Sequence, residues 1–119
     1  MIKQKLAHLS DQELVAEFKD AASSYGQAFE AGSPKETNKI YRYCESINAE
    51  IKRRGPSAVA MLVGLLDADQ PWVQYSAAAY TLDVEPVRAS LVLAKLKQAP
   101  KSLGVAALTT LWAWEMKQD

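Results

Sequence analysis

The chain has 119 residues, the length of one ordinary domain, and 49% of them are hydrophobic while 24% are charged. Fourteen basic residues balance fourteen acidic ones, which argues against a nucleic-acid binder, because such proteins usually carry a basic excess. A single cysteine excludes an internal disulfide framework, and a single histidine argues against a histidine-built metal site. The sequence shows no apolar run of membrane-spanning length and no signal peptide, so we expect one soluble, cytoplasmic domain over residues 1–119.

A capping box predicts the start of the first long helix. Ser10 can accept a hydrogen bond from the amide of Glu13, whose carboxylate can accept one from the amide of Ser10. Apolar residues then recur at spacings of three and four as far as Ala31, and Gly32 ends the helix.

Ser33 and Pro34 predict the start of a second helix, because proline is favoured at the first helical position. Lys52–Arg54 fall in its last turn, opposite the negative end of the helix dipole, before Gly55. Its apolar stripe consists of Ile40, Cys44, Ile47 and Ile51. We therefore expect Cys44 to be a small buried hydrophobe and residues 1–55 to form an N-terminal helical hairpin.

Four more helices are predicted after Pro56, and no segment alternates with the period of a strand. Their ranges are Ser57–Leu66, Trp72–Leu82, Val87–Ala99 and Pro100–Lys117. The sequence thus predicts an all-α protein of about six helices. A weak internal repeat with an offset of 29 residues relates the second of these helices to the fourth. The matching pairs are Pro71 with Pro100, Ala77 with Ala106, Ala78 with Ala107, and Leu82 with Leu111.

Residues 65–82, LLDADQPWVQYSAAAYTL, resemble a HEAT-type repeat, and a degenerate second copy extends the resemblance over residues 56–116. The layout is also similar to a family of small uncharacterised bacterial proteins with two N-terminal helices before HEAT-like helix pairs. The resemblance implies a short right-handed α-α superhelix of the HEAT/armadillo type, with two helix pairs in residues 56–119. Gln74 stands where HEAT repeats often carry arginine, so the resemblance does not extend to the polar ladder between repeats.

The chemistry-bearing residues do not form a catalytic set. His8 lies near the N-terminus, ahead of the first well-formed helix. Two acidic pairs, Asp67 with Asp69 and Asp83 with Glu85, are separated by a helix of roughly 15 Å, so helix capping explains them better than a shared cation. The glycines are scattered and form no phosphate loop. We expect no enzymatic activity, no cofactor and no metal.

Two short segments admit a binding role beside a structural one. Lys52–Arg54 could contact nucleic acid, although complementation of the helix dipole is the preferred explanation. Tyr41–Tyr43 places two aromatic residues around an arginine, a composition favoured at binding hot spots. The preferred interpretation is that these tyrosines flank the core of an amphipathic helix.

The last helix is apolar on two opposite faces, which one neighbour cannot cover. Either the N-terminal helices cover the second face or a partner protein does. Gln74 and Thr81 are taken to mark the solvent side of the helix at 72–82, and the 29-residue offset carries that side to the last helix. The resulting candidate partner-binding residues are Trp114, Leu103, Ala107, Thr110, Gln74 and Thr81. Trp112 is expected on the core side, with Val105, Leu108 and Met116.

These features predict a non-enzymatic protein-binding module. Small neutral helical domains of bacteria are often immunity proteins, which neutralise a toxin by covering its active site, and the resemblance permits that role. The alternatives are a scaffold subunit of a larger assembly and, against the zero net charge, a HEAT-like nucleic-acid-processing domain. The expected partner is a protein, such as a toxin, or a second copy bound through the C-terminal helix; neither nucleic acid nor membrane is expected.

Overall fold

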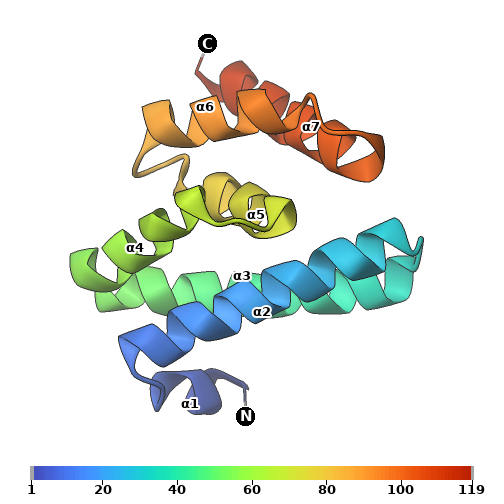
Figure 1. Ribbon diagram of the computed structural model, residues 1–119. Helices are drawn as coiled ribbons and strands as arrows, with labels where there is room; N and C mark the ends of the chain where they lie inside the picture. The colour runs from blue at the N-terminus through green and yellow to red at the C-terminus, as the bar shows by residue number, and fades with distance from the viewer. Residues whose placement is uncertain (1, 119) are drawn as a thin grey trace. The chain divides into compact units, whose positions relative to one another are not determined.

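The computed structural model describes residues 2–118, and in this range the chain forms α-helices, one 3-10 helix and no strands (Figure 1). The elements are α1 (Ile2–Ala7), α2 (Asp11–Glu30), α3 (Pro34–Arg54), α4 (Pro56–Val63), η1 (Gly64–Asp67), α5 (Pro71–Thr81), α6 (Pro86–Leu96) and α7 (Lys101–Lys117). The all-α prediction is confirmed. The sequence did not predict α1 or η1. No helix among the described residues has the length and apolar character needed to cross a membrane.

Contacts divide the chain into two units, which are described separately. The first unit, residues 1–64, holds α1 to α4, and the predicted hairpin of residues 1–55 lies within it. The second unit, residues 65–119, holds α5, α6 and α7.

The start of α2 is the capping box that the sequence predicts. The Ser10 hydroxyl accepts from the Glu13 amide at 3.1 Å, and the Glu13 carboxylate accepts from the Ser10 amide at 2.8 Å. These two bonds satisfy backbone donors that the first helical turn leaves without partners. Ser33 caps α3 with a single bond, in which its hydroxyl accepts from the Glu36 amide at 3.4 Å, and Pro34 lies in the first turn.

The core of the first unit lies between α2 and α3, with α4 against both. Its largest fully buried residues include Phe18 from α2, Ile47 and Ile51 from α3, and Leu62 from α4. Ile40, predicted in the same stripe, is only half-buried. Cys44 is 3% exposed, which confirms the prediction that it is buried.

Burial raises the pKa of the Cys44 thiol to about 11, chiefly because the thiolate would lose its hydration. We expect a thiol reagent at pH 8 to label the native protein at least tenfold more slowly than the protein unfolded in urea. Equal labelling rates would contradict the buried position.

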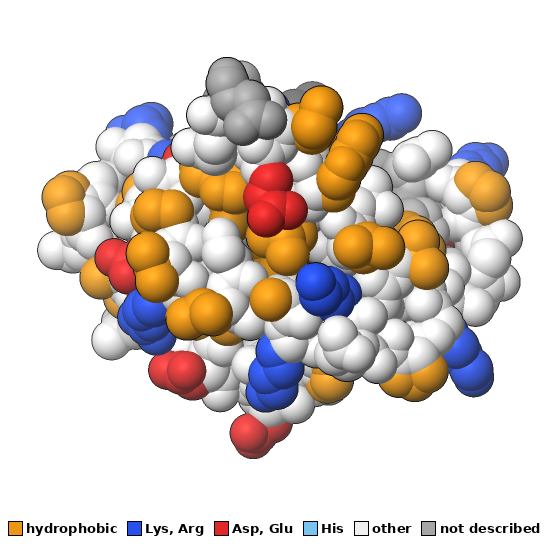
Figure 2. Space-filling view, turned by 90° about the horizontal axis from the view of Figure 1, so that it is seen from above, with side chains coloured by type: hydrophobic (Ala, Val, Ile, Leu, Met, Phe, Trp, Pro, Cys, Tyr) orange, Lys and Arg blue, Asp and Glu red, His pale blue; other side chains and the backbone are white. Residues whose placement is uncertain are grey.

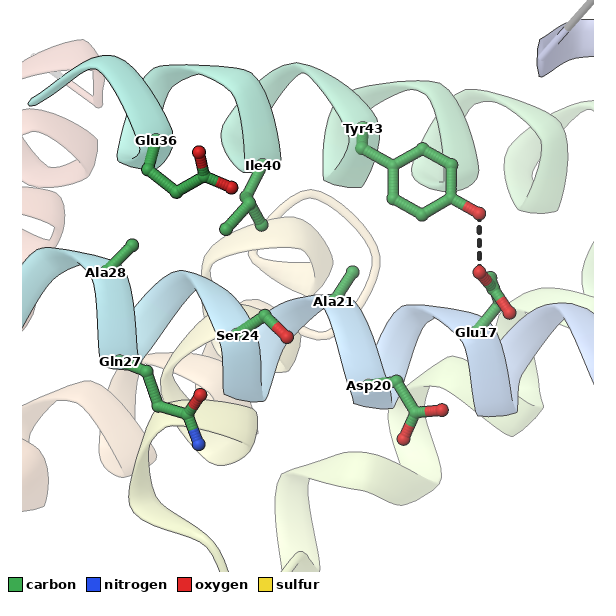
Figure 3. A pocket seen from close by; sticks show the side chains of 9 residues that line it. All are labelled: Glu17, Asp20, Ala21, Ser24, Gln27, Ala28, Glu36, Ile40 and Tyr43. Atoms are coloured by element: carbon green, nitrogen blue, oxygen red, sulfur yellow. Dashed lines mark hydrogen bonds between the residues drawn. The ribbon is translucent and has the colours of Figure 1, made fainter. Parts of the chain in front are cut away.

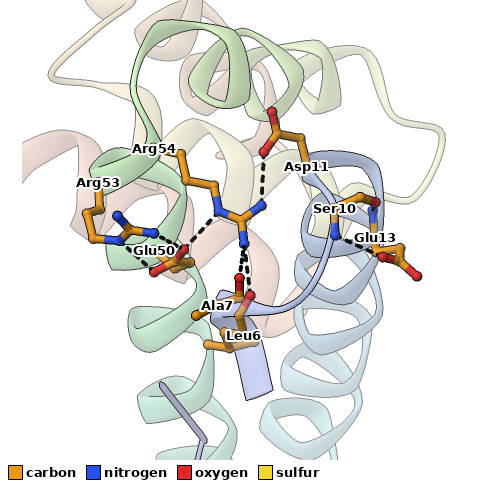
Figure 4. A network of polar contacts seen from close by, with 8 residues as sticks. All are labelled: Leu6, Ala7, Ser10, Asp11, Glu13, Glu50, Arg53 and Arg54. Carbon is orange, nitrogen blue, oxygen red and sulfur yellow. Dashed lines mark hydrogen bonds and ion pairs between the residues drawn. The ribbon is translucent and has the colours of Figure 1, made fainter. Parts of the chain in front are cut away.

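Arg54 joins three elements of the first unit (Figure 4). Its guanidinium donates to Glu50 at 2.8 Å, to Asp11 at the start of α2 at 2.9 Å, and to the Leu6 carbonyl at the end of α1 at 2.9 Å. Arg53 also donates to Glu50, and these donors lower the pKa of Glu50 to about 2. The ionised network therefore stabilises the fold above the ordinary carboxyl pKa, and this stabilisation is lost as the pH falls toward about 2. Arg54 therefore links α3 to α1 and α2, in addition to complementing the dipole of α3.

Arg54→Ala is expected to lower the urea midpoint of unfolding clearly more than Arg53→Ala. Both arginines bind Glu50, but only Arg54 also holds Asp11 and the carbonyl at the end of α1. Arg53 is therefore the matched control, with a side chain that is 66% exposed against 14% for Arg54. Equal shifts in the two midpoints would mean that the contacts beyond Glu50 contribute nothing.

In the second unit, α6 packs on both α5 and α7, and α5 also contacts α7. Three of the four residue pairs of the 29-residue repeat are buried in both copies: Ala77 and Ala106, Ala78 and Ala107, Leu82 and Leu111. Pro71 and Pro100, the fourth pair, are both exposed. The N-cap residues of α5 and α6 are Gln70 and Glu85, and neither makes a side-chain capping hydrogen bond, so the prediction that Glu85 caps α6 through its side chain is wrong. Asp67 lies 3.5 Å from the Arg88 guanidinium.

Candidate functional site

The exposed side of α7 is the side that the sequence analysis expected to be core. Four large apolar side chains on it are 54% to 63% exposed, and they follow one another at spacings of three, four and four. They are Val105, Leu108, Trp112 and Met116, named here the exposed stripe. Since Trp112 itself is 60% exposed, its assignment to the core is wrong.

The opposite side of α7 is the packed one. Leu103, Ala107 and Leu111 are buried, and Trp114 on the same side of the helix is half-buried. The sequence predicts that Leu103 and Ala107 meet a partner, with Trp114 as the principal contact. They instead form the side of the helix that packs, so the proposed face is misplaced.

Contrary to the prediction from the sequence, the polar residues of α5 and α7 do not mark the solvent side, because they are satisfied within the protein. Thr81 is fully buried, and its hydroxyl donates to the Ala77 carbonyl at 2.7 Å. Gln74 is half-buried, and its amide donates to the Leu66 carbonyl at 2.9 Å. Thr110 shares a 2.8 Å hydrogen bond with the Tyr75 hydroxyl. Each polar group finds a partner on the packed side, so it can point inward without an energetic penalty.

Large apolar side chains are also exposed on α6, which packs against α7. Val87 is 72% exposed and Leu91, four residues later, is 65% exposed. Figure 2 looks onto α6 and α7 and shows hydrophobic side chains spread over this face, with single charged side chains between them. Contiguous apolar patches of more than a few hundred Å² are uncommon on monomeric proteins and mark interaction sites.

A hollow lies in the first unit, along the groove between α2 and α3 (Figure 3). It has a volume of about 600 Å³, and its lining includes Glu17, Asp20 and Glu36 but no basic side chain. Tyr43 donates to Glu17 at 2.5 Å across the groove. Loss of hydration and then this bond raise the pKa of Tyr43 to about 12, which keeps the phenol protonated. The groove is therefore lined by acidic side chains, and its phenol is held in the protonated form.

The two tyrosines of the Tyr41–Tyr43 segment contact other residues of the first unit. Tyr41 lies with its ring 6.3 Å from that of Tyr25, and Tyr43 bonds Glu17, so both tyrosines lie at the edge of the α2–α3 contact as the preferred interpretation predicts. No group of three or more histidine, cysteine or acidic residues within residues 2–118 is placed to hold a metal ion.

Fold and surface together define a small all-α protein with an apolar helix face open to solvent. The family model described as "Domain of unknown function (DUF2019)" matches residues 12–111, and the chain belongs to this family. A crystal structure of the protein RPA1889 from Rhodopseudomonas palustris CGA009 is similar, with a TM-score of 0.82 and 23% sequence identity over 96% of this chain and 93% of that chain. At this identity the likeness shows the fold alone. A search of curated proteins finds no match.

Proposed function

We propose that this protein is a non-enzymatic protein-binding module whose contact surface is the exposed stripe of α7. The observation that carries the proposal is the stripe itself, in which four large apolar side chains lie on one helix face. A regular helix face of this kind suits another protein surface or helix, whereas small ligands prefer concave pockets. Tryptophan at the centre of such a face is typical of the residues that contribute most binding energy.

The chemistry of the reactive side chains supports a non-enzymatic role. The pKa of Cys44 lies at about 11 because the thiol is buried, and a protonated thiol is a poor nucleophile. Tyr43 is likewise held in its protonated form, with a pKa of about 12. The thiol of Cys44 and the phenol of Tyr43 are therefore both held in their protonated, less nucleophilic forms.

We propose a finer fold for the second unit and two specific roles for the protein. In the second unit we propose a HEAT-like arrangement, supported by the burial of the same repeat positions in α5 and α7. An immunity-type protein of the cytoplasm would bind a toxin through the stripe, and a scaffold subunit would bind a member of a larger assembly. The identity of the bound protein separates these two roles.

Affinity capture with matched baits tests the proposal. Immobilised wild-type protein, Trp112→Glu and Tyr41→Glu are exposed to a lysate of the source organism, and recovered proteins are quantified by mass spectrometry. We expect a protein that the wild type and Tyr41→Glu retain and that Trp112→Glu loses by at least tenfold. Tyr41 is a suitable control because it is 48% exposed but lies on α3. Loss with Tyr41→Glu alone would move the site to α3.

A further inference from the structure

We infer that a second copy of this chain covers the exposed stripe in the free protein, through antiparallel pairing of two α7 helices about a two-fold axis. The inference rests on the proposed function in one respect, since both need the stripe to be a protein-contact surface. It adds that self-association and partner binding use the same residues and exclude each other.

The area of the apolar face is close to what a stable dimer needs. The stripe exposes on the order of 450 Å², and Val87 and Leu91 of α6 bring the apolar surface to about 650 Å². A standard interface buries about 800 Å² on each partner, including its polar rim. The stripe and the two α6 residues together therefore supply most of the apolar area of one side of such an interface.

The spacing of the stripe makes it complementary to its own reversed copy. When two α7 helices run antiparallel with residues 110 and 111 near the axis, Trp112 of one copy lies opposite Leu108 of the other. Met116 then lies opposite Val105. Each of the four stripe residues lies level with its opposite residue in the other copy to within half a residue, which is about 0.8 Å along the helix. Each larger side chain meets a smaller one, which permits close packing and satisfies the requirement of a two-fold interface that one surface complement itself.

The charges of α7 agree with this register. Lys101 is exposed and falls on the same side of the helix as the stripe, one turn before Val105. In the antiparallel pair its ammonium group lies beside the C-terminal end of the partner helix, where the helix dipole favours a cation. The exposed Glu115 side chains of the two copies lie far from the axis, so they do not face each other.

Sedimentation of the purified protein over a wide concentration range tests the association. We expect a monomer–dimer equilibrium in which Trp112→Glu raises the dissociation constant at least tenfold, equivalent to about 1.4 kcal/mol, while Tyr41→Glu leaves it unchanged. Circular dichroism of each variant establishes that the helices are intact. A monomer at every concentration, or a dimer that Trp112→Glu does not weaken, would overturn the inference.

Cysteine cross-linking tests the register. Antiparallel pairing predicts a disulfide in a mixture of Leu108→Cys and Trp112→Cys proteins, because these two positions face each other across the interface. In the mixed dimer the symmetry-related pair still consists of the native Trp112 and Leu108. Either variant alone should cross-link poorly, because like positions are four residues apart along the axis, outside disulfide reach. Cross-linking of each variant with itself would indicate parallel pairing and would overturn the geometry. Cys44 does not compete, because it is buried.

The two proposals fail in different experiments. If the purified protein stays monomeric while capture from the lysate depends on Trp112, self-association is wrong and the proposed function stands. If the purified protein dimerises through Trp112 and the lysate yields no partner that depends on this residue, the inference stands and the binding of a different protein is wrong.

Discussion

Gly104→Ala is expected to lower the free energy of unfolding by about 2–4 kcal/mol, the range of an overpacked or strained buried site. Gly104 is buried in α7, where a Cβ atom would lie 2.1 Å from the Ala99 carbonyl oxygen and 3.2 Å from that of Lys97. Both obstacles are backbone atoms of the turn from α6, so relief requires α7 to move away from that turn. Urea unfolding followed by circular dichroism measures the loss.

Gly64→Ala is the matched control for this change. Gly64 has a helical φ of −57°, and a Cβ atom there would meet nothing within 4 Å. Alanine in a compatible helical position usually stabilises a protein by up to about 1 kcal/mol. If both substitutions destabilise the protein equally, the cost at Gly104 comes from a general loss of glycine and not from the close approach of α7 to the turn.

Local signals explain what the sequence predicts well. The bounds of α2 and α3 follow from Ser10, Glu13, Ser33 and Pro34, whose effects act within one helical turn. The burial of Cys44 follows from its place in an apolar stripe. These features need no knowledge of distant parts of the chain.

Long-range contacts explain what the sequence analysis missed. The carbonyl at the end of α1 is held by Arg54, which is 48 positions away, and a helix of six residues has no periodic pattern of its own. Gly104 is one of five scattered glycines in the sequence, and only the approach of the turn before α7 shows why it is needed.

The faces of α7 could not be told apart for a related reason. Both sides of the helix are apolar, so periodicity gives two equally good orientations. The choice then depended on the polar residues of α5, and polar residues mark solvent only when the protein offers them no partner. Thr81 donates to the backbone carbonyl four residues earlier and Gln74 to the one eight residues earlier, so both tolerate burial. The candidate site was therefore placed on the packed side.

The two tryptophans of α7 provide the decisive test of this corrected orientation. Trp114→Ala is expected to cost about 1–3 kcal/mol of stability, less than the 3–5 kcal/mol of a fully buried aromatic residue, because its side chain is half-buried. Trp112→Ala should cost under about 1 kcal/mol, since the side chain is 60% exposed, while weakening association through the stripe at least tenfold. Urea unfolding at low protein concentration, where self-association does not contribute, measures the stabilities, and sedimentation measures the association. A larger stability loss for Trp112→Ala than for Trp114→Ala would return Trp112 to the core. Because the two residues are only two positions apart, opposite effects on folding and association would separate the packed side of α7 from the side left for a partner.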